Sequence, residues 1–218
     1  MTLLQAITFK EIPTLSLLQA SYPALKALFF DMDGTLFNTE SFHEKALQSI
    51  AMTYKIRPPI GPEEVHALMM GKADHLIFEI VRYWENFPKN WTVEDFVNAK
   101  NEHLLKALSA VSADVYFMPE MRELLLKAKQ EGIYLALVTS SEKVVTQKLL
   151  ALAGLEKFFH LEITRNDSPE VKPHPWPYLE AKKISGFDNT EIIIFEDSEV
   201  GLMAAKASGP HVIKVGWY

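Results

Sequence analysis

The sequence predicts an α/β fold: a doubly wound, Rossmann-like parallel sheet with an inserted all-helical segment. Two observations predict it. From about residue 119 onward, short apolar runs alternate with helical patterns, and one more apolar run precedes them at 28–30. Between about 40 and 112, by contrast, the pattern is helical throughout. Strands separated by helices indicate a parallel sheet with right-handed crossovers, so the helical stretch interrupts an α/β domain after its first strand.

The first predicted strand ends in two acidic residues. The apolar run Leu28–Phe30 leads directly into Asp31 and Asp33, and Gly34 follows. Side chains two residues apart on a strand point to the same side, and ligands bind at the carboxyl ends of strands in open α/β sheets. Two carboxylates so close repel each other, which suggests a divalent cation or strongly shifted pKa values. The alternative is a solvated turn of the Asp-X-Asp-Gly kind.

The helical stretch contains several start signals. Ser41 is a candidate N-cap for the first helix, and Pro62, followed by two acids, starts a second one. Periodic apolar residues continue over 76–84 and 96–108. We therefore divide the chain into three parts: an N-terminal extension over 1–26 that packs on the main domain, an α/β domain made of 27–40 and 113–218, and a helical domain over 41–112.

The remaining chain alternates between helices and strands, and a glycine follows each helix. Such glycines commonly end helices by adopting a left-handed conformation. The predicted helices cover 119–131, 142–153, 175–184 and 200–207. The predicted strands cover 133–138, 159–164, 191–195 and 211–215.

Composition and charge narrow the classes of function. The chain of 218 residues carries 22 Lys and Arg against 28 Asp and Glu, a net charge of −6, without a basic tract. This argues against binding to nucleic acid or to an anionic membrane. The lack of cysteine excludes disulfides, thiol catalysis and thiolate zinc sites, and it fits a reducing cytoplasm. The apolar stretch over 15–30 is too short and interrupted to span a bilayer. We expect a cytoplasmic protein, either a monomer or a weak dimer.

Polar side chains gather where three predicted strands end. They form three pairs, Asp31 with Asp33, Thr139 with Ser140, and Glu196 with Asp197. In a doubly wound sheet, these strand ends face the same crevice. Lys172, just before a proline, precedes another helix on that edge. Each feature alone has an ordinary interpretation as a helix cap or a surface residue, but their coincidence predicts one site.

These pairs belong to four motifs in a fixed order. The motifs are Asp31-Met-Asp-Gly-Thr-Leu, Val138-Thr-Ser, Lys172-Pro-His-Pro and Phe195-Glu-Asp-Ser-Glu-Val-Gly. On these motifs the chain resembles the haloacid dehalogenase-like hydrolases, and among them the branch that holds small-molecule phosphatases and β-phosphoglucomutases. The resemblance covers nearly the whole chain from Ala27 to Gly216. It implies that the inserted helices form an all-helical cap on a haloacid dehalogenase-like core.

The resemblance implies a metal-dependent phosphatase mechanism. Asp31 is the implied nucleophile, which forms an aspartyl-phosphate, and Asp33 is the implied acid and base for the leaving oxygen and the water. Mg²⁺ is implied between Asp31 and the phosphate, held also by the backbone carbonyl of Asp33 and by Asp197, with Glu196 as a ligand or outer support. Oxygen ligands favour Mg²⁺ over zinc.

The resemblance also implies a phosphate-binding set. Thr139 and the backbone amide of Ser140 hold phosphoryl oxygens, and Lys172 adds a fixed positive charge. A dehalogenase is not favoured, because that branch needs neither the Asp33 position nor a metal. A catalytically idle binding protein is not favoured either, because Asp31, Asp33, Lys172 and Asp197 are all present.

The choice between hydrolysis and phosphoryl transfer depends on the implied cap. His43 matches a histidine of the mutases, but many phosphatases carry one too, and a histidine on an ordinary helix face is equally compatible. In β-phosphoglucomutases an arginine of one cap loop binds the far phosphate. Here that position is Asp74, an acid that would repel a second phosphate, although Lys72 could serve in its place.

We therefore expect hydrolysis of a small phosphorylated metabolite, with a sugar phosphate as the first candidate. A β-phosphoglucomutase-like phosphosugar mutase is the alternative. The aromatic residues Tyr83, Trp84 and Trp91 are expected in the core of the helical domain rather than against a sugar.

Overall fold

The computed structural model describes residues 10–69 and 74–218. They divide into two compact units. One is Glu40–Ser112, called here the helical unit, and the other comprises the flanking segments up to Thr39 and from Ala113, called here the α/β unit. Among the described residues, every helix is too short or too polar to span a lipid bilayer.

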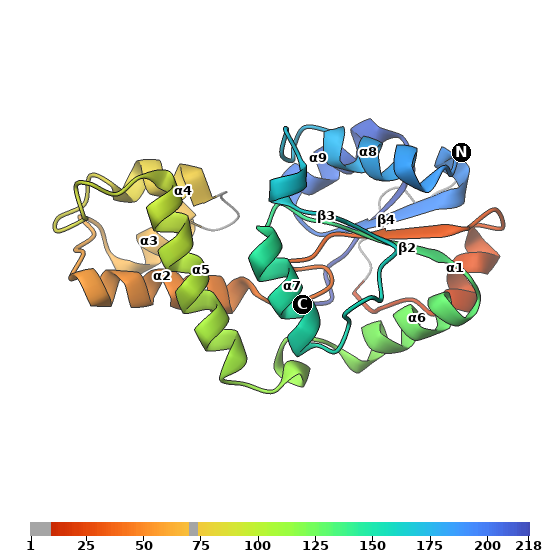
Figure 1. The fold of residues 1–218 in the computed structure, drawn as a ribbon, viewed down its shortest axis with the longest axis horizontal. Coiled ribbons are helices and arrows are strands. Elements are labelled where there is room, and N and C mark those ends of the chain that lie inside the picture. Colours follow the sequence, from red (N-terminus) through yellow and green to blue (C-terminus); the bar gives the residue numbers. More distant parts are fainter. Residues whose placement is uncertain (1–9, 70–73) are drawn as a thin grey trace. The chain divides into compact units, whose positions relative to one another are not determined.

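In its described part, the α/β unit is built on one parallel sheet of five strands (Figure 1). Their order across the sheet is β3-β2-β1-β4-β5. The strands are β1 Ala27–Phe30, β2 Tyr134–Val138, β3 Leu161–Ile163, β4 Ile192–Glu196 and β5 His211–Lys214. β1 lies in the middle, where Ala27 pairs with Tyr134 on one side and Ile192 on the other. The predicted parallel, doubly wound fold class is thus confirmed, because the chain returns from the β3 edge to the opposite side of β1.

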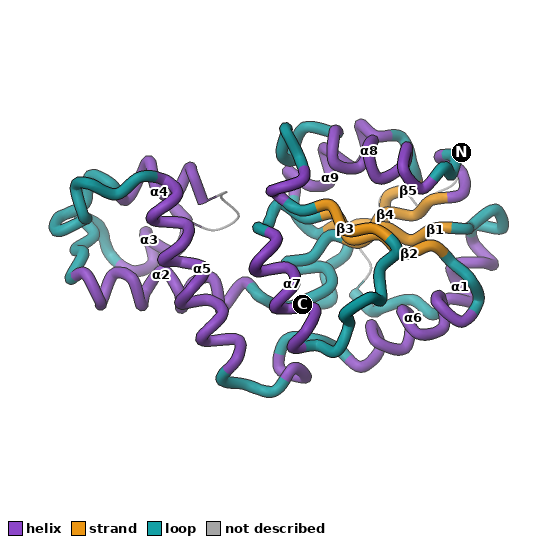
Figure 2. The backbone as a smooth tube through the Cα atoms, viewed as in Figure 1, coloured by secondary structure: helices purple, strands orange, loops and turns teal. Residues whose placement is uncertain are grey.

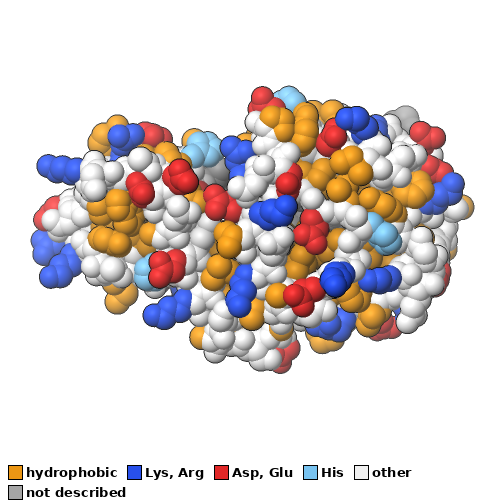
Figure 3. All heavy atoms as spheres, viewed as in Figure 1, with side chains coloured by type: hydrophobic (Ala, Val, Ile, Leu, Met, Phe, Trp, Pro, Cys, Tyr) orange, Lys and Arg blue, Asp and Glu red, His pale blue; other side chains and the backbone are white. Residues whose placement is uncertain are grey.

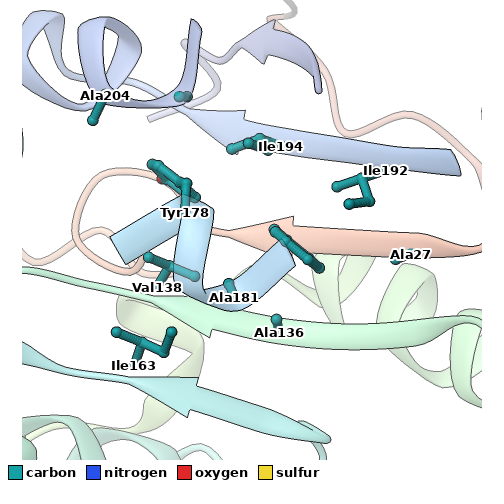
Figure 4. Packing of buried hydrophobic residues seen from close by; sticks show 11 residues of the cluster. Ala27, Ala136, Val138, Ile163, Tyr178, Ala181, Ile192, Ile194 and Ala204 are labelled. Atoms are coloured by element: carbon teal, nitrogen blue, oxygen red, sulfur yellow. The ribbon is translucent and has the colours of Figure 1, made fainter. Parts of the chain in front are cut away.

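Helices cover both faces of this sheet (Figure 1, Figure 2). One face carries α8 Trp176–Ser185 and α9 Glu199–Ser208, and the other carries α1 Leu15–Ser21, α6 Pro119–Gln130 and α7 Lys143–Leu152. Toward α8, the side chains of β1, β2 and β4 bury a core of alanine, β-branched and aromatic residues around Tyr178 and Ala181 (Figure 4). On the opposite face, Phe30 stacks on Phe195 with ring centroids 4.9 Å apart. A sheet buried on both faces explains why its strands read as continuous apolar runs.

The helix ends follow the sequence signals closely. Gly186 and Gly209 take left-handed conformations at the ends of α8 and α9, as predicted. The helix α1 lies in the N-terminal extension, for which the sequence predicts no secondary structure. Its N-cap Thr14 accepts a hydrogen bond from the backbone N–H of Leu17 (3.3 Å), and its buried face is Leu15 and Leu18.

Over residues 40–69 and 74–112, which the structure describes, the helical unit has four helices, α2 Glu40–Tyr54, α3 Pro62–Met69, α4 Asp74–Val81 and α5 Val93–Ser109. Its core is aromatic, with Phe78, Phe87 and Phe96 in mutual edge-on or tilted contact. Trp84 and Trp91 pack against this core as predicted.

Two details of the helical unit correct the sequence analysis. Ser41 is not the N-cap of the first helix, because α2 already begins at Glu40. Tyr83 is not in the core: it follows the end of α4, is 78% exposed, and lies beneath the guanidinium of Arg82. The helix that should have buried its ring ends two residues earlier, at Val81.

Candidate active site

Three carboxylates meet at the carboxyl edge of the sheet. Asp31 directly follows β1, Glu196 is the last residue of β4, and Asp197 follows it. One oxygen of each lies within 4.8 Å of the others. β1 and β4 are neighbours in register, with Phe30 opposite Phe195, so the residues that end these strands are brought together by the sheet itself.

Lys172 joins two of these carboxylates. Its Nζ donates to Asp31 Oδ1 (2.5 Å), to Glu196 Oε2 (2.8 Å) and to the carbonyl oxygen of Val138 at the end of β2 (2.9 Å). The lysine is buried, as are Asp31 and Glu196. The cluster of Asp31, Glu196, Asp197 and Lys172 therefore has three potential negative charges and one positive charge in a poorly solvated place.

Burial and mutual repulsion shift the titration of this cluster. Burial, and after it the charge of Glu196, raises the pKa of Asp31 well above its usual range, against the attraction of Lys172. Burial and Glu196 likewise raise the pKa of Asp197 to about 6. For Lys172, burial alone would lower the pKa, but Asp31 and Glu196 outweigh it and raise the pKa well above the usual value. Lys172 is thus a permanent cation, while burial and mutual repulsion oppose the simultaneous ionisation of the acids around it.

Glu196 is held by hydrogen bonds on both oxygens. Oε2 accepts from the hydroxyl of Tyr178 (2.7 Å) as well as from Lys172, and Oε1 accepts from the hydroxyl of Ser198 (3.0 Å). Gly201 in the first turn of α9 lies so close that a β-carbon there would overlap the Glu196 carboxylate. Sequence reasoning assigned no role to Tyr178 or Gly201. A buried tyrosine needs a partner for its hydroxyl, and Gly201 was visible only as part of the last motif.

Asp197 is oriented by the turn that follows Asp31 and Asp33. The hydroxyl of Thr35 donates to Asp197 Oδ1 (2.9 Å). Gly34 has φ of +79°, which glycine adopts readily, and a β-carbon there would overlap the Asp197 carboxylate. Gly34 is therefore required twice, for the conformation of the turn and for the close approach of Asp197.

Asp33 is separate from the three-carboxylate group. Its carboxylate accepts hydrogen bonds from the hydroxyls of Thr39 (2.5 Å) and Ser141 (2.6 Å) and is only partly buried. Ser141 in turn donates its backbone N–H to Thr139 Oγ1 (3.0 Å). Thr139 is buried, whereas Ser140 is exposed. Sequence reasoning missed Thr39 and Ser141, which no strand-end pattern marks as partners of Asp33.

The remaining predicted residues belong to the helical unit. His43 is half-buried on α2. Asp74 is the first residue of α4, and its carboxylate forms an ion pair with the buried ammonium of Lys100 on α5. The negative charge expected to repel a second phosphate is therefore already balanced within this unit. Lys72 lies outside the described residues.

The donor set of the three-carboxylate group fits a divalent cation. Every ligand atom it offers is a carboxylate oxygen, which suits hard cations. The repulsion among these acids, which Lys172 offsets only in part, gives a physical reason for a cation to bind. When it binds, the carboxylates can ionise without mutual repulsion.

Comparisons with known proteins agree with this geometry. A family model described as haloacid dehalogenase-like hydrolase matches residues 28–215. The Phosphorylated carbohydrates phosphatase of Thermotoga maritima is 29% identical over 185 residues, covering 85% of this chain and 82% of that protein. Protein CbbY of Rhodobacter capsulatus is 28% identical over 198 residues, covering 87% and 84%.

A solved structure shows the same fold. A mutant CbbY of Rhodobacter sphaeroides in complex with xylulose-(1,5)bisphosphate has a TM-score of 0.77 at 25% sequence identity, covering 88% of this chain and 86% of that one. The family model spans most of the chain, including every residue of the five strands except Ala27. The predicted family and the predicted hydrolase class are confirmed. This chain belongs to the haloacid dehalogenase-like hydrolases.

Proposed function

We propose that this protein is a Mg²⁺-dependent phosphatase that hydrolyses a small phosphorylated metabolite, with a sugar phosphate as the first candidate, through an aspartyl-phosphate on Asp31. The observation that carries the proposal is the buried contact of Asp31 with Lys172 beside Glu196 and Asp197. This arrangement provides a carboxylate nucleophile, a fixed cation and further acids at one sheet edge. It is what phosphoryl transfer needs, since positioning and charge stabilisation supply most of its catalysis.

In the first step, a carboxylate oxygen of Asp31 bonds to phosphorus as the bond to the ester oxygen breaks. The leaving oxygen takes a proton from Asp33. In the second step, Asp33 removes a proton from water, the water oxygen bonds to phosphorus, and the bond to Asp31 breaks. Phosphate leaves and Asp31 is a carboxylate again. The hydroxyls of Thr39 and Ser141 hold the Asp33 carboxylate in one orientation between the two steps.

We propose that Asp31, Asp197 and the backbone carbonyl of Asp33 hold the Mg²⁺. Because both oxygens of Glu196 accept hydrogen bonds from protein groups, we assign this residue the outer, supporting role. When bound, the ion offsets the repulsion between the anionic nucleophile and the phosphate dianion. Thr139, the backbone amide of Ser140 and the ammonium of Lys172 bind the phosphoryl oxygens.

We further propose that the helical unit is the cap that selects the substrate. The named activity of the Thermotoga maritima relative favours a phosphorylated carbohydrate. The bisphosphate in the Rhodobacter sphaeroides structure supports two alternative activities, a phosphosugar mutase and a bisphosphate phosphatase. Since Lys100 neutralises Asp74, repulsion by Asp74 is a weaker argument against a second phosphate than the sequence alone suggests.

The sequence also supports a proposal for the compartment, the oligomeric state and the type of substrate of this enzyme. We propose a cytoplasmic monomer or weak dimer that acts on a small molecule rather than on nucleic acid, because the chain lacks cysteine and carries net negative charge. On the face of the α/β unit drawn in Figure 3, Lys and Arg side chains are interspersed with Asp and Glu and do not form a basic patch.

The test is a panel of phosphate esters offered to the purified protein with Mg²⁺. We expect phosphate release from sugar monophosphates. Borohydride added during turnover should convert Asp31 to homoserine, because it reduces an aspartyl-phosphate, and mass spectrometry locates the change. Isomerisation of β-glucose 1-phosphate with glucose 1,6-bisphosphate present is followed beside phosphate release. Rapid isomerisation with negligible phosphate release would show that the protein is a mutase and not a phosphatase. The lack of a reaction with any ester would refute both activities.

A further inference from the structure

Two side chains that follow β5 reach the turn next to the proposed nucleophile. The indole N–H of Trp217 donates to the carbonyl oxygen of Thr35 (2.9 Å), and the hydroxyl of Tyr218 donates to the carbonyl oxygen of Leu36 (3.0 Å). Thr35 and Leu36 are fully buried. A buried carbonyl oxygen needs a donor, so these two contacts complete the turn.

The hydrogen bonds within the turn use other carbonyl groups. The N–H of Gly34 donates to Phe37 O (2.7 Å), and the N–H groups of Leu36 and Phe37 both donate to Met32 O (2.9 Å each). These bonds tie the two ends of the turn together. The Thr35 carbonyl is held instead by Trp217, and the Leu36 carbonyl, one residue beyond the Thr35 side chain, is held by Tyr218.

The position of Thr35 matters because its hydroxyl donates to Asp197 (2.9 Å). The same turn touches Asp197 a second time at Gly34, where there is no room for a β-carbon. A displacement of the Thr35 backbone would therefore alter both contacts with Asp197. Asp197 is one of the three carboxylates that could hold a metal ion.

Trp217 is itself fixed by the strands that carry the site. Its side chain is buried, with 9% exposed, and its ring lies 6.0 Å from that of Phe195 on β4, which stacks on Phe30 of β1. Two residues earlier, the N–H of Val215 donates to Glu196 O (2.9 Å). The indole thus connects the rigid sheet to the turn.

We propose that Trp217 is a positioning residue of the active site: through the Thr35 backbone, its indole N–H holds the Thr35 hydroxyl against Asp197 and so maintains the metal-binding geometry. The inference rests on the proposed function, since it takes Asp197 as a ligand of a divalent cation. Trp217 lies outside all four motifs, after the last strand of the sheet.

The test compares Trp217→Phe with Tyr218→Phe. The first variant keeps an aromatic ring and removes the donor to Thr35, and the second removes an equivalent donor to Leu36. Mn²⁺ is the probe, and its binding in the absence of substrate is measured by electron paramagnetic resonance. For Trp217→Phe we expect at least fivefold weaker Mn²⁺ binding and a lower kcat for p-nitrophenyl phosphate, with KM within twofold. For Tyr218→Phe we expect both to stay within twofold of wild type.

A double-mutant cycle asks whether Trp217 acts through Thr35. Thr35→Val removes the hydroxyl that reaches Asp197. We expect Trp217→Phe to weaken Mn²⁺ binding no further in the Thr35→Val background. Losses that multiply would overturn the proposed route, because they would mean that the indole acts independently of the Thr35 hydroxyl. If circular dichroism shows that Trp217→Phe is unfolded, 3-benzothienylalanine at position 217 removes only the N–H and replaces it in every measurement.

The two proposals fail in different ways. A wild-type protein that binds Mn²⁺ and releases phosphate, with Trp217 variants that do both equally well, would overturn the positioning role alone. A wild-type protein that neither binds Mn²⁺ nor releases phosphate from any ester would overturn the proposed function and this inference with it.

Discussion

Asp197 leads to a specific prediction about stability, because its negative charge is costly when no cation is bound. Burial, and after it Glu196, raises the pKa of this carboxyl from 3.8 to about 6, against the hydrogen bond from Thr35. A carboxyl whose pKa rises on folding favours the native state when protonated. Its stabilising contribution is therefore fully present below about pH 4 and is lost as the pH rises through 6.

The two pKa values give the size of this effect. A shift of about 2 units corresponds to about 3 kcal/mol of unfolding free energy, lost by pH 8 in metal-free protein. Roughly half of that loss falls between pH 5 and pH 8. Asp197→Asn removes the titrating group and keeps an oxygen that accepts from Thr35. We expect the variant to exceed wild type in stability at pH 8 in EDTA by up to about 3 kcal/mol, and the two to converge toward pH 4.

The assay is urea unfolding followed by circular dichroism at four pH values between 5 and 8, in EDTA and in excess Mg²⁺. Magnesium should stabilise wild type by mass action and should stabilise Asp197→Asn much less. The matched control is Asp114→Asn at an exposed position. A difference between Asp197→Asn and wild type that does not change with pH, or a variant less stable than wild type at pH 8 in EDTA, would refute the electrostatic reasoning.

Four further outcomes are expected. Asp31→Asn should abolish phosphate release while the circular dichroism spectrum stays that of the folded wild type, since an amide is not a nucleophile for phosphorus. EDTA should remove the activity and Mg²⁺ should restore it, while Ca²⁺ inhibits, because Ca²⁺ prefers more ligands at longer distances. Gly201→Ala should lower the free energy of unfolding by about 1–3 kcal/mol, because its methyl group overlaps Glu196, with Gly61→Ala as a control where the contacts are ordinary. Asp74→Ala should destabilise by about 3 kcal/mol in urea unfolding, because it leaves the buried Lys100 ammonium without its partner.

Each of these outcomes has a counterpart that would contradict it. Turnover by Asp31→Asn in a sample free of deamidation would remove the nucleophile assignment. Full activity after exhaustive chelation would remove the metal site. Equal unfolding midpoints for Gly201→Ala and Gly61→Ala would mean that the Glu196 side chain has room to move. Unchanged stability of Asp74→Ala would mean that Lys100 finds solvent or another acceptor.

The elements of the fold were largely predictable because each carries a local signal. The strand at Ala27–Phe30 is an apolar run that ends in acids, and α8 and α9 stop at glycines that the sequence marks. The helix α1 escaped prediction because seven residues provide too little periodicity. Tyr83 was misplaced for a related reason: periodicity does not locate the last turn of a helix, and α4 ends at Val81.

The sequence was enough to predict which residues lie together at the strand ends. It was not enough to predict which of their side chains bond to one another. That Asp31 and Glu196 share an edge follows from topology alone. That Lys172 connects them, with Tyr178 beneath, depends on how α8 packs on the sheet, which no short-range pattern encodes. The ion pair between Asp74 and Lys100 was not predictable either, because Asp74 begins α4 and Lys100 lies on α5.

The central position of β1 has a consequence for how this chain is made. Ala27 pairs with Tyr134 and Ile192, and the whole helical unit is encoded between β1 and both of its neighbours. On the ribosome, this apolar central strand therefore emerges long before either of its neighbours can pair with it. Such non-local pairing slows folding. It leaves apolar segments exposed, and these can aggregate or bind chaperones. Asp31 cannot be buried beside Glu196 until β4 has been synthesised. On the role proposed for Asp31, the nascent chain should therefore have no phosphatase activity before that point. Activity should appear only after the sheet has assembled.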